Sequence, residues 1–275
     1  MSTLTALVQQ PAVRGVYFTG SVANGIAIQK AAAGRIIPVG LELGGNDPAY
    51  VRADVDIAWA AENMVDGAVF NSGQSCCSVE RVYVHESIYE DFVKALVKVL
   101  EGYKLGDPLD PATQLGPVVS AASAKNIKSH VDDAVAKGAR NLTPDVFATG
   151  TALGGNFVRP ELLVDCTHSM RVMVEETFGP IIPVMKVSGD AEAVQLMNDS
   201  TLGLTASVWT KDVALAEELI ENVDAGTVFV NRCDYPSPDL AWTGAKDSGR
   251  GVTLGKGGFE GFVRSKSYHV KAYKV

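Results

Sequence analysis

Apolar and polar positions along the chain follow two periods that alternate from one segment to the next. Apolar residues three and four positions apart predict helices at 22–33, 87–103, 121–137, 191–198 and 213–222. The same spacing predicts another helix that begins at a cap, either Asp54 or Asp56, and runs to about Phe70. Short apolar or alternating runs predict strands at 13–19, 36–43, 49–51, 81–85, 181–187, 206–209 and 227–230. Because a strand–helix–strand unit places its two strands in a parallel sheet, this alternation predicts an α/β fold with mostly parallel sheet.

Composition limits the classes of protein to which the chain can belong. Its 275 residues can form one large domain or two modest ones, and 47% hydrophobic with 20% charged residues is typical of a soluble globular protein. The net charge of −8 argues against a nucleic-acid partner, because non-specific binding needs a basic face that displaces counterions from phosphates. No apolar run reaches the length of a membrane span, and the first residues lack the features of a signal peptide. We therefore expect no membrane partner.

The cysteines and histidines do not predict a metal site. Cys76, Cys77, Cys166 and Cys233 form no Cys-x-x-Cys pair, and the histidines are scattered along the chain. Adjacent cysteines rarely bridge each other, so we expect reduced thiols and a cytoplasmic protein.

Two short segments carry the candidate chemistry. Glu42 lies at the end of a predicted strand, before a pair of glycines, and Cys76 follows 34 positions later in a glycine-containing loop. A thiol becomes a strong nucleophile when amides or a base favour its anion, and a carboxylate at the carboxyl end of a strand can deprotonate a thiol or a water. The alternative is that Cys76 and Cys77 are small buried hydrophobic residues, as most free cysteines are.

Further short segments occur in an order and at a spacing that point to one family. They are Phe18-Thr19-Gly20-Ser21 with Gly25, Leu41-Glu42-Leu43-Gly44-Gly45, Gln74 with Cys76, Glu175-Glu176-Thr177-Phe178-Gly179-Pro180, Asn198 with Leu202-Gly203-Leu204 and Ala206, Gly226 to Asn231, and Lys246 with Ser248-Gly249. On these segments the chain resembles the C-terminal, catalytic portion of the aldehyde dehydrogenase superfamily. The resemblance covers essentially the whole chain.

The resemblance implies a role for each member of the candidate pair. Cys76 would attack an aldehyde carbonyl and form a thiohemiacetal, from which a hydride would leave to NAD or NADP. Glu42 would then activate the water that hydrolyses the thioester, and Cys77 would be a neighbour without a role in the reaction.

The same resemblance implies contacts with the nicotinamide cofactor. Glu176 and Phe178 would touch the nicotinamide ribose and ring, and Leu43 and the turn that contains Gly20, Ser21 and Gly25 would lie beneath the cofactor. Structural alternatives stay open for several of these residues. The two glycines of the turn can simply permit tight packing between helix and strand, Glu176 can be an exposed loop residue, and Phe178 can belong to the core.

The resemblance also implies a domain organisation. Members of the family are usually longer, and the asparagine of their oxyanion hole and the residues that hold the adenosine ribose have no counterpart in residues 1–15. We therefore expect residues 1–44 to be a remnant of a dinucleotide-binding domain and residues 45–260 to be the catalytic domain. Residues 261–275 would be an oligomerisation tail that pairs subunits into a homo-oligomer through the extended stretch 265–274. With so short a remnant, we expect binding of NAD or NADP to be weak or absent.

Three functions are consistent with these features. The first is oxidation of a small aldehyde by the mechanism of the family. The second is hydrolysis of an activated ester by Cys76, which requires no dinucleotide. The third is an inactive protein that only assembles. An aromatic residue at Trp242 indicates an apolar mouth for the substrate, whereas Phe259 is also consistent with ordinary core packing.

Overall fold

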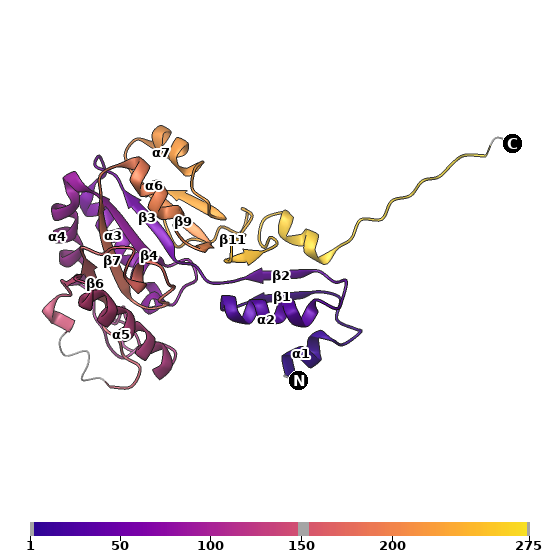
Figure 1. The fold of residues 1–275 in the computed structure, drawn as a ribbon, viewed down its shortest axis with the longest axis horizontal. Helices are drawn as coiled ribbons and strands as arrows, with labels where there is room; N and C mark the ends of the chain where they lie inside the picture. The colour runs from indigo at the N-terminus through magenta and orange to yellow at the C-terminus, as the bar shows by residue number, and fades with distance from the viewer. Residues whose placement is uncertain (1–2, 148–153, 274–275) are drawn as a thin grey trace.

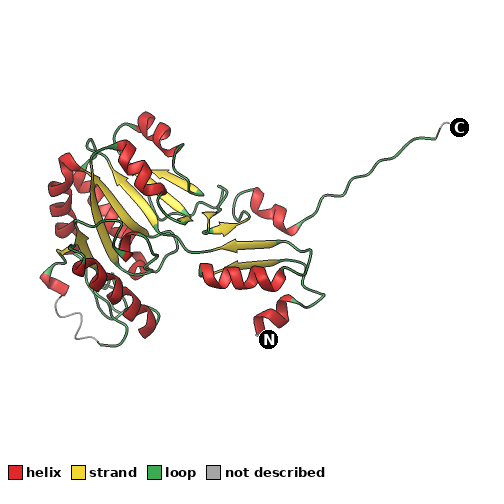
Figure 2. Cartoon of the chain, viewed as in Figure 1, coloured by secondary structure: helices red, strands yellow, loops and turns green. Residues whose placement is uncertain are grey.

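The computed structural model, which describes residues 3–147 and 154–273, has an α/β fold built on two main sheets, with a short two-stranded ribbon of β8 (Leu202–Gly203) and β11 (Ala245–Lys246) besides (Figures 1 and 2). The larger sheet has seven strands in the order β10-β9-β3-β4-β7-β6-β5. Six of them are parallel: β3 (Asp47–Val51), β4 (Val79–His85), β6 (Glu161–Val164), β7 (Ile181–Val187), β9 (Thr205–Trp209) and β10 (Thr227–Val230). The edge strand β5 (Arg140–Asn141) is antiparallel. The predicted mostly parallel α/β fold is confirmed.

Helices cover both faces of the larger sheet and give it two hydrophobic cores (Figure 1). Alternation along the strands supplies both cores, since in β4 Val82 and Val84 face one side while Tyr83 faces the other. One core contains residues of α3 (Ile57–Val69) and α4 (Tyr89–Leu100), and the other contains residues of α5 (Ala121–Ala136), α6 (Asp190–Asn198) and α7 (Val213–Ile220).

Local chemistry decides where several elements begin. Asp56 caps α3, because its carboxylate accepts a hydrogen bond of 3.1 Å from the backbone N–H of Trp59, whereas Asp54 caps the turn at Lys211 and Asp212. The strand predicted at 36–43 begins only at Val39, after Pro38, which has no N–H to donate. The helix predicted at 87–103 is shorter, since a 3₁₀ turn at Glu86–Ile88 precedes α4.

The smaller sheet contains the predicted βαβ unit. The strands β1 (Val16–Thr19) and β2 (Val39–Glu42) pair in parallel, and α2 (Val22–Ala32) connects them. A third strand, β12 (Gly249–Arg250), pairs antiparallel with β2, so a segment near the C-terminus completes a sheet that the N-terminal segment begins. The sequence pattern did not indicate this strand, nor β5 and β6 of the larger sheet, nor the other short elements α1 (Thr3–Val8), β8 and β11.

The C-terminal tail extends away from the two sheets (Figure 1). Residues 263–273 are extended and pair with no strand of the described chain, and the side chains of Tyr268, Val270 and Tyr273 are exposed. Lys274, the last residue of the predicted pairing stretch, lies outside the described residues. The domain boundaries at 44 and 260 stay a prediction, as does pairing of subunits through this tail. No helix in the described ranges has both the length and the apolar character needed to cross a membrane.

Close approach of α2 to β2 depends on Gly25. A Cβ atom at this buried position would lie 2.6 Å from Leu43 Cδ2, whereas a side chain at Gly34, just after α2, would meet nothing within 4 Å. Gly25 therefore has a packing role in this sheet.

We predict that Gly25→Ala lowers the free energy of unfolding by about 1 kcal/mol, because the displacement of Leu43 by the new methyl group outweighs the gain in helix propensity within α2. Urea denaturation measures the change, with Gly34→Ala as the matched control that stays close to the parent. A Gly25→Ala variant as stable as the control would contradict the packing role.

Candidate active site

The predicted site residues meet where the two sheets join. Glu42 ends β2, and Cys76 lies in the loop between α3 and β4, so the smaller sheet carries the carboxylate and the larger sheet carries the thiol. Both residues line one cavity of about 350 Å³. The other lining residues are Thr19, Gly20, Ser21, Leu43, Gly44, Glu176 and Phe178. Gly25 is the one predicted cofactor residue that does not line this cavity.

The loop that leads to Cys76 has an unusual backbone. Asn71, Ser72 and Gly73 all have left-handed conformations, with φ of 51°, 58° and 69°. This conformation costs a residue with a side chain about 1–2 kcal/mol, and the Ser72 hydroxyl offsets part of that cost by donating a 2.9 Å hydrogen bond to the carbonyl of Gly116. Any side chain at Gly73 would overlap the backbone of Gly179. The loop is therefore held tightly against the segment that carries Glu176 and Phe178.

Two glycines allow the segments of the site to approach each other. A side chain at Gly45 would overlap the backbone carbonyl of Cys76, and one at Gly44 would overlap the carboxylate of Glu176. The Gly45 N–H donates a 3.1 Å hydrogen bond to Glu176 Oε1. Both close approaches require the absence of Cβ atoms, which explains the glycine pair after Leu43.

The environment of Cys76 favours its thiolate. The pKa of Cys76 is lowered, first by a hydrogen bond from the Cys77 thiol and then by a backbone hydrogen bond, against burial and the negative charges of Asp234 and Glu176. The Cys77 Sγ also lies 2.8 Å from Asp234 Oδ1, so Asp234 competes with Cys76 for the single proton of Cys77. Asp234 Oδ1 further accepts a 2.9 Å hydrogen bond from Ser75. All four cysteines, each in the described part of the chain, are free thiols.

Glu42 has the environment of a general base. Burial raises its pKa, and a hydrogen bond of 2.8 Å from the Thr253 hydroxyl to Oε1 opposes that shift. The buried Oε2 accepts no hydrogen bond from any described residue, so one oxygen is held in place and the other can take a proton. A carboxylate with a raised pKa is a stronger base than a free one, which suits proton abstraction from water.

The strand that carries Glu42, β2, is held in place by a residue from the C-terminal part of the chain. Ser248, which is fully buried, donates from its hydroxyl to the carbonyl of Gly44 at 2.7 Å and accepts from the Gly203 N–H at 2.9 Å. Its own carbonyl accepts a 2.8 Å hydrogen bond from the Leu43 N–H. These contacts hold the ends of β2 and β12 in register.

Glu176 and Phe178 line the cavity from the segment that precedes β7. Burial raises the pKa of Glu176, and its bond from Gly45 opposes the shift. The ring of Phe178 is 40% exposed, and its backbone is left-handed with φ of 52°. The backbone N–H groups of Thr177 and Phe178 each donate a 2.8 Å hydrogen bond to the buried Glu80, which does not line the cavity.

The lining residues fit the nicotinamide half of a dinucleotide. Ser21 caps α2, so the partial positive charge of this helix N-terminus lies at the cavity, where it favours an anionic group. Glu176 can accept hydrogen bonds from ribose hydroxyls, and Phe178 offers a half-exposed ring face. Among the described residues that line the cavity there is no lysine or arginine. The expected weakness of dinucleotide binding stays a prediction.

Several contributors to the site carried no signal in the sequence. Thr253, Asp234 and Glu80 lie 211, 157 and 98 positions from the partners that they contact in the site. Trp242 is buried in a small cluster with Cys77 and Leu204, against which Cys76 also packs, and it does not line the cavity. Its part in a substrate mouth stays a prediction. Phe259 is 74% exposed and belongs to no core.

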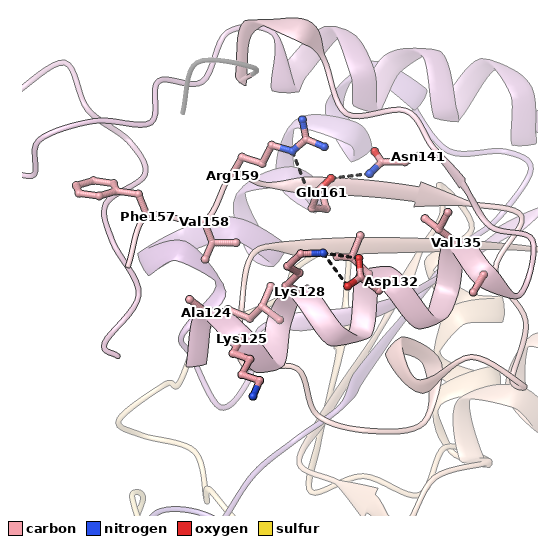
Figure 3. A pocket seen from close by; sticks show the side chains of 13 residues that line it. Ala124, Lys125, Lys128, Asp132, Val135, Asn141, Phe157, Val158, Arg159 and Glu161 are labelled. Atoms are coloured by element: carbon pink, nitrogen blue, oxygen red, sulfur yellow. Dashed lines mark hydrogen bonds and ion pairs between the residues drawn. The ribbon is translucent and has the colours of Figure 1, made fainter. Parts of the chain in front are cut away.

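A larger cavity of about 990 Å³ lies elsewhere, between α5 and the segment from Phe157 to Glu161 (Figure 3). Its lining is mainly apolar, and its charged side chains are largely paired with each other, Lys128 with Asp132 and Arg159 with Glu161. It contains neither Cys76 nor another thiol. The smaller cavity is therefore the candidate active site.

The sequence pattern of the aldehyde dehydrogenase family matches residues 1–268. The chain belongs to the aldehyde dehydrogenase family. Its sequence is 42% identical over 250 residues to a 4,4'-diapolycopene aldehyde oxidase of Methylomonas sp, covering 90% of this chain and 46% of that protein. It is 40% identical to a peroxisomal aminoaldehyde dehydrogenase 1 of Pisum sativum, covering 95% of this chain and 52% of that protein.

Solved structures of aldehyde dehydrogenases share the fold. An NAD-dependent aldehyde dehydrogenase from Sinorhizobium meliloti superposes with a TM-score of 0.91 at 34% identity, covering 97% of this chain and 53% of that one. An NADP-dependent glyceraldehyde-3-phosphate dehydrogenase from Bacillus halodurans, complexed with NADP, gives 0.88 at 36% identity, covering 94% and 53%. The chain thus spans about half the length of the curated relatives it matches.

We predict opposite shifts in the pKa of Cys76 for two substitutions. Cys77→Ala removes the thiol that donates to Cys76, so the pKa of Cys76 rises. Asp234→Asn removes a nearby negative charge, so the pKa falls. The pH dependence of alkylation of Cys76 by iodoacetamide, followed by mass spectrometry, reports both shifts.

The control for these two variants is Cys166→Ala, which removes a buried thiol that does not line the cavity. Its alkylation profile at Cys76 should match that of the parent. Shifts of the same sign in the two test variants would contradict the proposed electrostatic balance.

Proposed function

We propose that the protein oxidises a small aldehyde to a carboxylate with NAD or NADP, and that Cys76 is the nucleophile and Glu42 the general base. The observation that carries this proposal is the single cavity that Cys76 and Glu42 share with Glu176 and Phe178. A thiol with a lowered pKa and a carboxylate with a raised pKa are the two groups that acyl transfer through a thioester requires.

The first step is addition of the Cys76 thiolate to the aldehyde carbonyl carbon. A C–S bond forms, and the carbonyl oxygen becomes an oxyanion that backbone N–H groups of the Cys76 loop can stabilise. A dinucleotide held against Glu176, Phe178 and the turn at Gly20 and Ser21 would supply the hydride acceptor for the former carbonyl carbon. Cys76 would then carry the acyl group as a thioester.

The second step is hydrolysis of this thioester. Glu42 takes a proton from a water, whose oxygen attacks the acyl carbon, and the C–S bond breaks to release the carboxylate product and the Cys76 thiolate. The hydrogen bond from Thr253 keeps Oε1 of Glu42 fixed while Oε2 receives the proton.

We predict that the purified chain reduces NAD or NADP in the presence of an aldehyde such as propanal, at millimolar dinucleotide. Cys76→Ala abolishes this turnover because no thioester can form. Glu42→Gln lowers turnover about 100-fold while Cys76 still becomes acylated, because the general base acts only in hydrolysis. Absorbance of the reduced nicotinamide and mass spectrometry of the acyl-enzyme measure the two effects, and Cys166→Ala is the matched control. Turnover that survives in Cys76→Ala would refute the assignment.

A second function, hydrolysis of activated esters, is favoured by the described lining of the cavity. Its residues include the nucleophile and the base but no basic side chain for the phosphates of a dinucleotide. An ester acylates Cys76 without a hydride acceptor, so this activity does not depend on cofactor binding.

We predict measurable release of p-nitrophenolate from p-nitrophenyl acetate in the absence of any dinucleotide, and its loss in Cys76→Ala. Calorimetric titration with NAD is expected to show only weak binding, which is why the oxidation assay uses millimolar dinucleotide. If the Cys76→Ala variant hydrolyses the ester as fast as the parent, ester hydrolysis at this site is ruled out. Absence of turnover with both substrates, in an intact oligomer, would favour the third possibility, a protein that only assembles.

We also propose that the chain forms a homo-oligomer through its tail. Support comes from the extended and exposed stretch 263–273, in which the β-branched and aromatic residues Val263, Tyr268, Val270 and Tyr273 present unpaired backbone. A cytoplasmic location likewise stays a prediction.

A further inference from the structure

A buried carboxylate lies directly behind the wall of the active-site cavity. Glu80 is the second residue of β4 and is 4% exposed. Its Oε1 accepts a 2.8 Å hydrogen bond from the Phe178 N–H, and its Oε2 accepts one of 2.8 Å from the Thr177 N–H. A third donor, Asn46 Nδ2, lies 3.1 Å from Oε2. The carboxylate therefore binds two consecutive backbone amides of the wall.

Asn46 contacts both Glu80 and the start of the wall segment that Glu80 binds. Its Nδ2 also donates to the carbonyl of Glu175 at 3.3 Å, so Glu80 and Asn46 together hold both ends of the stretch from Glu175 to Phe178. On the other side, the Thr177 hydroxyl and His130 Nδ1 are 2.9 Å apart. These contacts hold the Thr177 side chain in the protein interior, so that its two neighbours in the chain, Glu176 and Phe178, face the cavity.

The two neighbours of Thr177 are the residues that line the cavity. Glu176 and Phe178 both do so, whereas Thr177 is 4% exposed and does not. Phe178 reaches its position only through a left-handed backbone, φ 52°, which a phenylalanine does not adopt without an external constraint. The bond from its N–H to Glu80 supplies such a constraint at the strained residue itself.

We propose that Glu80 is a positioning residue that holds Glu176 and Phe178 in the orientation needed to receive the nicotinamide end of the dinucleotide. This inference rests on the proposed aldehyde oxidation, since it assigns Glu80 to the hydride-transfer step. Glu42 is held by Thr253 and, through Gly44, by Ser248, and the loop of Cys76 is also held by the bonds from Ser72 to Gly116 and from Ser75 to Asp234. Acylation of Cys76 by an ester therefore depends on Glu80 less than hydride transfer does.

Another buried glutamate, Glu161, serves as a control for Glu80, because it has structural contacts but lies away from the active-site cavity. Glu161 in β6 is also buried, at 8% exposure, and its carboxylate binds Asn141, Thr143 and Arg159, none of which lines the active-site cavity. Burial, together with the nearby negative charge of Glu176, raises the pKa of Glu80 to about 8, and the two amides and Asn46 oppose the shift.

The ionised form of Glu80 offers both oxygens as acceptors to the two amides, so parent and variants are compared at a pH above this pKa.

The test replaces Glu80 with glutamine, which keeps the size of the side chain but has one acceptor oxygen and one N–H₂ group. One of the two amides then loses its acceptor. We expect hydrogen exchange at Thr177 and Phe178 to accelerate by about tenfold or more in Glu80→Gln, and not in Glu161→Gln. Exchange in the 177–178 region that is equal in parent and Glu80→Gln would overturn the proposal.

Kinetics separate positioning from loss of folded protein. We expect kcat for aldehyde oxidation to fall at least tenfold in Glu80→Gln while hydrolysis of p-nitrophenyl acetate by Cys76 stays within about twofold of the parent. A proportional fall of both activities would overturn the proposal, because a smaller folded fraction lowers both equally. If the parent oxidises no aldehyde, the proposed function fails, and the exchange result still decides whether Glu80 holds the wall.

A second variant covers the case in which Glu80→Gln does not fold. Asn46→Ala removes one of the three donors to Glu80 and the bond to the Glu175 carbonyl, and leaves both amide contacts in place. We expect a smaller acceleration of exchange, about threefold, in the same segment. Unchanged exchange there in Asn46→Ala would count against the proposal.

Discussion

The close approach of three segments at Gly44 and Gly45 is the constraint on which the site depends. Here the end of β2, the carbonyl of Cys76 and the carboxylate of Glu176 come together in a space that no side chain could share. The glycine pair has no chemical group of its own to contribute. Its value is steric, because it lets Glu42, Cys76 and the segment with Glu176 and Phe178 share one cavity of modest size. The electrostatic features of the site follow from this proximity.

The charged groups near Cys76 are negative, although a thiolate is more often stabilised by a nearby positive charge. Carboxylates surround Cys76, and those of Asp234 and Glu176 raise its pKa, yet hydrogen bonds from Cys77 and the backbone lower the pKa more. The thiolate is therefore stabilised by short-range donors rather than by a cation.

Much of the architecture could be predicted from the sequence, because the features that determine it involve residues close together in the chain. Helical spacing in α3, the cap at Asp56 and the β-branched runs of β4 and β7 are properties of neighbouring residues, and so were the motifs that contain Glu42 and Cys76. The contacts of Thr253 with Glu42 and of Glu80 with Phe178 join residues 211 and 98 positions apart, and no local pattern encodes them. The short strand β12 escaped prediction for the same reason, since two residues form a strand only where β2 is already present.

Glu42 and Cys76 are carried by different sheets with separate cores. Glu42 lies on the small sheet, beside the cluster of Ile28, Leu41 and Leu43, while Cys76 precedes a strand of the seven-stranded sheet. The distance between the Glu42 carboxylate and the Cys76 sulfur therefore depends on how the two sheets are placed against each other, as well as on the rotamers of the two side chains.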